Sequence, residues 1–131
     1  MTSSKLGASI VLLYLAGCAG SAGYQPPPVP ASAVTLDDQQ ILSTLMDKKL
    51  YGTTREGSRP YSITFSADGT DVFQMSPNLP EKERWTLTNG VVCVMPKDYP
   101  KECSQVKTAN DEYWFVDPAS NKVNSHLRVK Q

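Results

Sequence analysis

The dipeptide Asn89-Gly90 restricts the fold most, because it separates two short stretches rich in strand-forming residues, 85–88 and 91–94. Asn-Gly favours a two-residue turn whose twist matches that of paired strands, so the segment predicts a β-hairpin. A turn of this length fixes the register, and therefore which side chains share a face. The face expected to be buried carries Trp85, Leu87, Val92 and Val94, with Trp85 opposite Val94 and Leu87 opposite Val92.

The same period of two recurs through most of the chain after residue 60. Tyr61, Ile63 and Phe65 alternate with polar residues, and Asp68-Gly69 then marks a turn. Together with the hairpin, these segments predict about six or seven short antiparallel strands. The further strands are expected at 71–75, 104–108, 112–116 and 123–129.

One helix is expected ahead of the strands, at about residues 36–50. Thr35 followed three residues later by Asp38 is typical of a helix N-terminus, and Gly52 fits a C-terminal stop. The expected fold class is therefore α+β, with one N-terminal helix packed on a curved antiparallel sheet or small open barrel of about six or seven strands. The apolar stripe of the helix consists of Ile41, Leu42, Leu45, Met46 and Leu50.

Residues 1–17 have the pattern of an export signal. Lys5 supplies a positive charge, and residues 6–15 follow it as an apolar run. This run is about ten residues long, whereas a helix needs roughly 20 to cross a bilayer. We therefore exclude residues 1–17 from the fold and expect them to be a signal peptide.

The four residues Leu15-Ala16-Gly17-Cys18 resemble the lipobox of bacterial lipoproteins. The resemblance implies that Cys18 begins the mature chain and carries a thioether-linked diacylglycerol, often with a further acyl chain, such as palmitate, on its amino group. Each buried methylene contributes about 0.8 kcal/mol, so two or three such chains hold a domain at a membrane. Ala19, in place of Asp, resembles the pattern sorted to an outer membrane, where the domain would face the periplasm or the cell surface.

The residues after Cys18 are small or Pro-rich as far as residue 34. Such a composition does not bury a core and favours extended chain. The expected organisation is a lipoprotein signal peptide at 1–17, a lipidated Cys and flexible tether at 18–34, and a globular α+β domain at 35–131.

The chain has three cysteines, and lipidation of Cys18 leaves Cys93 and Cys103 to each other. An exported protein keeps such a disulfide, and closing a loop of about eleven residues contributes on the order of 3 kcal/mol. The alternative is a redox-active pair, although catalytic dithiols usually lie two residues apart beside a group that stabilises the thiolate. We expect a structural disulfide.

Charge and motifs argue against several classes of function. Lys+Arg and Asp+Glu both number 13, so no net charge drives the chain toward nucleic acid. The single histidine, His126, falls on the polar face of the last expected strand, and the sequence has no nucleophile elbow, phosphate loop or zinc motif. We expect no enzyme activity, no metal and no cofactor. The carboxylates beside expected turns are interpreted as turn caps: Asp68, Asp71, Asp98, Asp111 and Asp117.

The strand at 112–116 is the most apolar of the set. Tyr113, Trp114 and Phe115 are consecutive, so both faces of the strand are apolar. Either both faces are buried between layers, or these three residues line a ligand cavity or a partner surface. The loops at 54–60 and 76–84 are further candidate contact surfaces.

The layout of residues 35–129 resembles small secreted bacterial domains of unknown function, and its Trp…Cys…Cys order resembles the small barrel inhibitors of secreted metalloproteases. The leading hypothesis is a non-enzymatic outer-membrane lipoprotein whose disulfide-stapled domain binds an envelope protein or supports an envelope assembly. The alternatives are an envelope protease inhibitor and a small-ligand carrier with an interior lined by Trp85 or Trp114.

Overall fold

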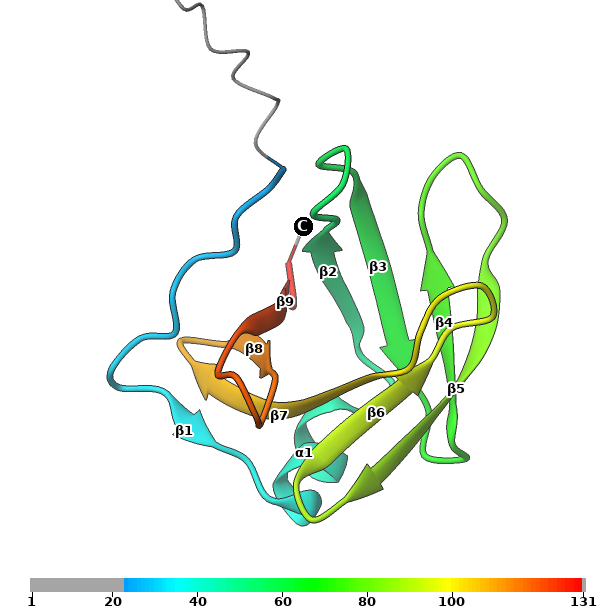
Figure 1. Ribbon diagram of the computed structural model, residues 1–131. Helices are drawn as coiled ribbons and strands as arrows, with labels where there is room; N and C mark the ends of the chain where they lie inside the picture. The colour runs from blue at the N-terminus through cyan, green and yellow to red at the C-terminus, as the bar shows by residue number, and fades with distance from the viewer. Residues whose placement is uncertain (1–22, 131) are drawn as a thin grey trace, which may run out of the picture.

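The computed structural model describes residues 23–130, so the signal segment, the lipobox and Cys18 lie outside the described residues. The described chain contains one helix and nine strands, joined by short turns at one end and longer loops at the other (Figure 1). The elements are β1 Val34–Thr35, α1 Asp38–Leu45, β2 Lys49–Thr53, β3 Pro60–Phe65, β4 Thr70–Gln74, β5 Glu81–Thr88, β6 Val91–Met95, β7 Glu102–Ala109, β8 Glu112–Val116 and β9 Val123–Arg128.

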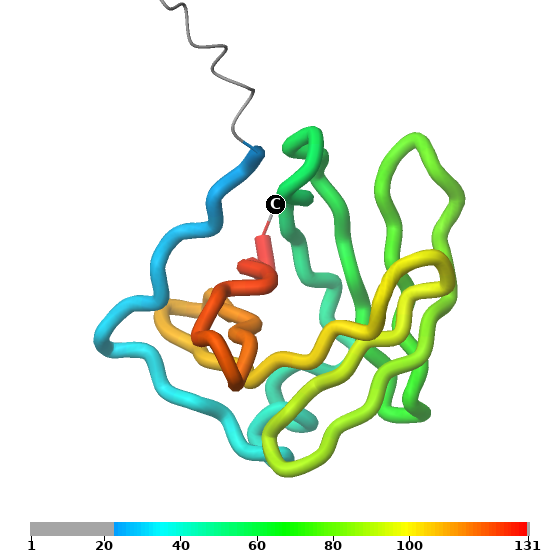
Figure 2. Tube along the Cα trace, in the orientation of Figure 1, coloured from blue at the N-terminus to red at the C-terminus, as the bar shows by residue number. Residues whose placement is uncertain are grey.

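Strands β2 to β9 form a closed antiparallel barrel in which every strand pairs with its neighbours in sequence. The pairing of β2 with β9, at Tyr51 and Arg128, closes the ring (Figures 1 and 2). Strand β1 lies outside the ring and extends the sheet beside the second half of β7. The predicted α+β class is therefore wrong: the domain is almost entirely sheet, and its single short helix does not cover a sheet face.

The missing eighth strand explains the error. The expected helix extends to residue 50 and ends at Gly52, but α1 stops at Leu45 and the chain reverses through Asp47, whose φ is 60°. Residues 49–53 form β2. Leu50 fits both a helical stripe and an inward position of a strand, so its apolar character could not decide between them. Strand β2 pairs with the edge strand β9 and so closes the sheet into a barrel, which would otherwise stay open.

Gly52 has a different role from the predicted helix stop. It lies in β2 opposite Tyr61, and a Cβ at this position would lie 2.6 Å from the Tyr61 hydroxyl and 2.8 Å from a Leu127 methyl carbon. The absence of a side chain at Gly52 leaves the space that these two inward side chains occupy.

Helix α1 begins with a capping box. The Gln40 amide donates to Asp37 Oδ1 at 2.8 Å, and the Asp37 amide donates to Gln40 Oε1 at 2.9 Å. The predicted N-terminus at Thr35 and Asp38 is thus two residues early. Ile41 and Leu45 are buried, so the helix inserts its apolar face into one end of the barrel.

The predicted hairpin is confirmed in full, with Trp85 opposite Val94 and Leu87 opposite Val92. Its buried face joins the barrel core, where the Phe65 ring lies 5.5 Å from Trp85 and 6.1 Å from Phe115, centroid to centroid. The space between α1 and these strands has no room for a water molecule, so this half of the barrel is filled.

The two ends of the barrel differ, and we name them by their contents. Because neighbouring strands are antiparallel, the loops at 54–59, 75–80, 96–101 and 117–122 share one end, called here the loop end. The short turns after β3, β5 and β7 share the opposite end with α1, called here the helix end.

The predicted disulfide between Cys93 and Cys103 is confirmed. The two residues are direct register partners on β6 and β7, with their Cα atoms 4.0 Å apart. Their inward neighbours on these strands include Val92 and Ser104, so the bridge lies on the outer face of the barrel. The bridge links β6 to the first half of β7, which pairs with β6, whereas the second half of β7 pairs with β8.

Candidate functional site

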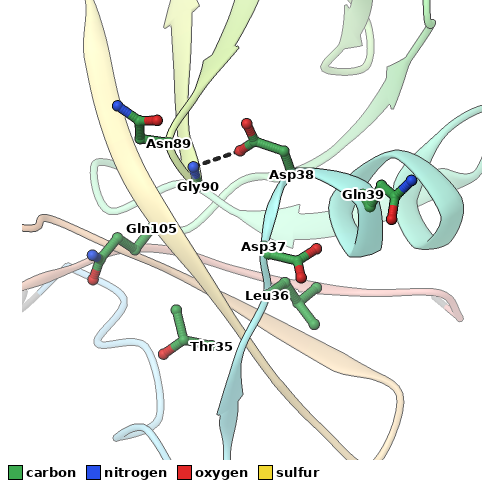
Figure 3. Close-up of a pocket in the computed structure, with 8 residues that line it drawn as sticks. All are labelled: Thr35, Leu36, Asp37, Asp38, Gln39, Asn89, Gly90 and Gln105. Carbon is green, nitrogen blue, oxygen red and sulfur yellow. Dashed lines mark hydrogen bonds between the residues drawn. The ribbon is translucent and has the colours of Figure 1, made fainter.

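A shallow depression at the helix end is the first candidate site, and Figure 3 shows its lining. Its volume is about 540 Å³ and it opens widely to solvent. The start of α1 forms one wall, and the β5–β6 turn and β7 form the other (Figure 3). The lining residues are Thr35, Leu36, Asp37, Asp38, Gln39, Asn89, Gly90 and Gln105.

The depression is held together by one contact between its walls. The Gly90 amide donates to Asp38 Oδ1 at 2.5 Å, which ties the β5–β6 turn to the first turn of α1 (Figure 3). Asn89 and Gly90 have φ values of 49° and 74°, the left-handed geometry that this turn type requires. The Asn-Gly dipeptide that set the hairpin therefore also aims an amide at the helix.

The lining chemistry suits hydrogen bonding to a protein segment. Gln39, Asn89 and Gln105 carry amides that both donate and accept, and two carboxylates stand beside them. Asp37 and Asp38 already occupy the positive end of the helix dipole, so an anionic ligand would meet like charge there. The surface favours a polar or basic partner.

A pair of carboxyl groups inside the barrel is the second candidate site. Asp71 on β4 and Glu83 on β5 are register partners, and both are buried. Asp71 also lies opposite Phe65, a core residue, which shows that it points inward. Both carboxylate oxygens of Asp71 are buried without a hydrogen-bond partner among the described residues. We call Asp71 and Glu83 the carboxyl pair.

Burial is the larger cause and the neighbouring Glu83 carboxyl the smaller one, and together they raise the pKa of Asp71 to about 8. Burial likewise raises the pKa of Glu83, while its contact with Asp71 lowers it. Because the two residues are register partners inside the barrel, ionisation of one carboxyl disfavours ionisation of the other. Asp71 is the first residue of the strand expected at 71–75, and its place beside Asp68-Gly69 led to its interpretation as a turn cap. In the structure it pairs with Phe65, a core residue, so it points inward.

The other turn carboxylates behave as predicted where the structure shows contacts for them. Asp68 Oδ1 accepts from the amide and the hydroxyl of Thr70, and these bonds hold the pKa of Asp68 below its usual value. Asp117 Oδ1 accepts from the amides of Ala119 and Ser120, with the same effect on its pKa. Both are turn caps.

The predicted binding surface at Tyr113, Trp114 and Phe115 needs correction, because all three residues are buried. Tyr113 and Phe115 point into the barrel and belong to its core. Trp114 points outward but is only 2% exposed, since another part of the chain covers it. These three residues therefore present no free surface to a partner or ligand.

The cover over Trp114 is the stretch of residues 23–35, called here the N-terminal strap. It runs along the outside of the barrel past β8 and β9 and ends in β1 (blue to cyan in Figures 1 and 2). The Trp114 indole Nε1 donates to the Pro27 carbonyl at 3.0 Å. Val34 and Thr35 pair with β7, and the Leu36 amide donates to the Val106 carbonyl at 2.9 Å. Most of the segment assigned to a flexible tether thus lies against the domain.

His126 shares this covered site, although an exposed position was predicted for it. It is Trp114's register partner on β9, and the two rings lie 4.8 Å apart. Its Nε2 lies 3.2 Å from Glu112 Oε1. Burial lowers the pKa of His126, and the nearby Glu112 carboxylate opposes that shift. The predicted alternation of β9 holds from Ser125 to Arg128, but a register shift interrupts it between Val123 and Ser125. No pattern in the sequence predicts that the strap covers Trp114 beside His126.

No protein-family model, curated protein or solved structure matches this chain. Among residues 23–130, no cluster of three or more His, Cys, Asp or Glu side chains is arranged to hold a metal ion. Over the same range, no helix has the length and hydropathy needed to cross a membrane.

The carboxyl pair makes a pH-dependent stability prediction. Because the folded-state pKa of Asp71 is raised, its stabilising contribution is complete below the unfolded pKa near 4 and is lost as pH rises through about 8. We expect Asp71→Asn to raise the free energy of unfolding by on the order of 2 kcal/mol at pH 9 and to flatten its fall between pH 5 and 9. Urea unfolding at several pH values measures both.

Asp68→Asn is the matched control, since Asp68 lies three residues away and its pKa shift has the opposite sign. This variant should leave the alkaline loss of stability in place. An Asp71→Asn chain that loses stability with rising pH as steeply as the unchanged chain would contradict the assignment.

Proposed function

We propose that the chain is a bacterial outer-membrane lipoprotein, anchored through lipid on Cys18, whose barrel binds an envelope protein at the helix-end depression. The anchor rests on the lipobox resemblance at residues 15–18 and on the apolar run before it. The observation that carries the binding role is the depression of about 540 Å³, an open polar surface built from three separate segments of the chain.

The filled half of the barrel supports a binding role over that of a carrier. A carrier needs an enclosed, mostly apolar cavity of several hundred cubic ångströms. The apolar half of this barrel, beside Trp85 and Phe65, has no room for even a water molecule. The other candidate carrier residue, Trp114, faces the strap on the outside.

The inhibitor hypothesis is weakened by the strap. A chain segment that blocks a protease must enter the protease's cleft, and in this domain either the N-terminal segment or a loop would have to do so. Residues 23–35 are instead fixed to the barrel by the Trp114–Pro27 hydrogen bond and by β1. Only the loops would remain for such a role.

Site-specific photo-crosslinking in intact envelopes tests the binding site. We expect a photo-crosslinking residue in place of Gln39, which is exposed on the wall of the depression, to give a discrete crosslinked product with an envelope protein. The same residue in place of Val72, which is 40% exposed on the outer face of β4, is the control and should give none. Equal crosslinking from both positions, or a product from position 72 alone, would refute the assignment.

The anchor has a separate test. Cys18→Ser removes the thiol that receives the diacylglycerol, so we expect an unprocessed or soluble product that leaves the detergent phase in a phase-partitioning assay. The barrel lies outside this change, and its unfolding free energy should stay the same. Unchanged partitioning of the Cys18→Ser chain into detergent would show that Cys18 is not the anchor.

A further inference from the structure

We infer that the loop end of the barrel faces the lipid bilayer and that Leu79 and Tyr99, at the tips of two of its loops, enter the headgroup layer. This inference rests on the proposed lipid anchor at Cys18 and adds an orientation and a membrane-contact surface to it.

The strap begins beside the β2–β3 loop, at the loop end of the barrel. Gly23 lies against the Arg55 carbonyl oxygen so closely that a side chain at position 23 has no room. Arg55 belongs to the β2–β3 loop, and its guanidinium donates to the carbonyl of Val123, the first residue of β9. Gly23 is therefore held at the loop end, and the strap runs from there toward the helix end (Figure 1).

The chain between Cys18 and Gly23 limits the reach of the anchor. Five residue spacings separate Cys18 from Gly23, and an extended chain spans at most about 3.6 Å per residue, or about 18 Å in all. An eight-residue strand such as β5 has seven residue spacings and is roughly 23 Å long. A lipid on Cys18 therefore keeps Gly23 within about 18 Å of the bilayer, less than the length of such a strand. The loop end is then the nearer end, and the helix-end depression points away from the membrane.

The loop end exposes two large apolar side chains to solvent. Leu79 is 84% exposed and Tyr99 is 75% exposed, the two most exposed large apolar side chains among the described residues. Leu79 lies in the β4–β5 loop and Tyr99 in the β6–β7 loop, so both belong to the end from which the strap begins. Exposing large apolar side chains to water is unfavourable, whereas the headgroup layer of a bilayer accommodates them and is enriched in Tyr.

The loop that carries Leu79 is joined to the loop that holds Gly23. Arg59 of the β2–β3 loop donates from Nη2 to the Ser76 carbonyl at 2.8 Å, and the Asn78 amide closes a turn on the Met75 carbonyl at 2.8 Å. The start of the strap and the tip at Leu79 are thus connected through one loop. Residues 76–80 carry no charge, so this tip would enter a lipid interface without desolvating an ion.

The flanks of Tyr99 match the same surface. Lys97 and Lys101 are exposed two residues to either side of it, with Asp98 between. Lysine ammonium groups are attracted to anionic lipid headgroups, while the tyrosine ring occupies the boundary between headgroups and acyl chains. Two loop tips alone bind too weakly to hold a domain, so we assign them orientation and leave retention to the anchor.

Quenching of tryptophan emission by brominated lipid tests the orientation. The processed, lipidated chain is reconstituted in vesicles of phosphatidylethanolamine and phosphatidylglycerol, in which brominated phosphatidylcholine replaces part of the lipid. The variants are Leu79→Trp and Tyr99→Trp, and the control is Gln39→Trp at the helix end. Trp85 and Trp114 are buried and give the same background in every chain. We expect both loop variants to lose emission beyond that background and the Gln39→Trp chain to lose none.

Flotation of the same vesicles distinguishes a wrong orientation from a missing lipid anchor. If the chains float with the vesicles and Gln39→Trp is quenched as strongly as the loop variants, or no added tryptophan is quenched, the orientation is wrong and the anchor stands. If the chains do not float, the anchor fails and the orientation fails with it.

Discussion

The hydrogen bond from the Trp114 indole to the Pro27 carbonyl is the contact on which most of this account depends. It fixes the strap to the outer face of β8, where the strap covers Trp114 and the ring of His126 lies against Trp114. Together with the close approach of Gly23 to the Arg55 carbonyl, it shortens the free chain, because the segment available as a tether ends at Gly23 and not at residue 34. The distance between the domain and any lipid on Cys18 follows from these two contacts.

Closure of the barrel is the second constraint, and it explains the interior. Once β2 pairs with β9, each strand has a defined inner and outer face, and Asp71 and Glu83 are forced inside. Burial beside Glu83 raises the pKa of Asp71, which makes the domain less stable at alkaline pH. At the helix end, α1 closes the barrel with Ile41 and Leu45, so the apolar half is filled.

Local sequence chemistry predicted the local structure well. The Asn89-Gly90 hairpin, its register and the cap at Asp117 follow from turn preference, and the Cys93–Cys103 bridge follows from setting Cys18 aside as the lipidated cysteine. The structure has each of them. The errors concern contacts between distant segments. Leu50 fits the periodicity of a helix as well as that of a strand. Asp71 is interpreted as a turn cap unless its pairing with Phe65 is known, and the proline-rich strap shows no pattern that predicts packing against Trp114. Of the two candidate sites, only the turn residues of the depression could be placed in advance.

Exchange of the Trp114 indole proton with solvent, followed by NMR, tests most directly whether the strap stays bound to the barrel in solution. The account predicts that this proton exchanges far more slowly than that of a free indole, because it is buried and bonded to the Pro27 carbonyl. Exchange at the rate of an exposed indole would show that the strap leaves the barrel in solution. The short tether and the orientation at the membrane would then both be wrong.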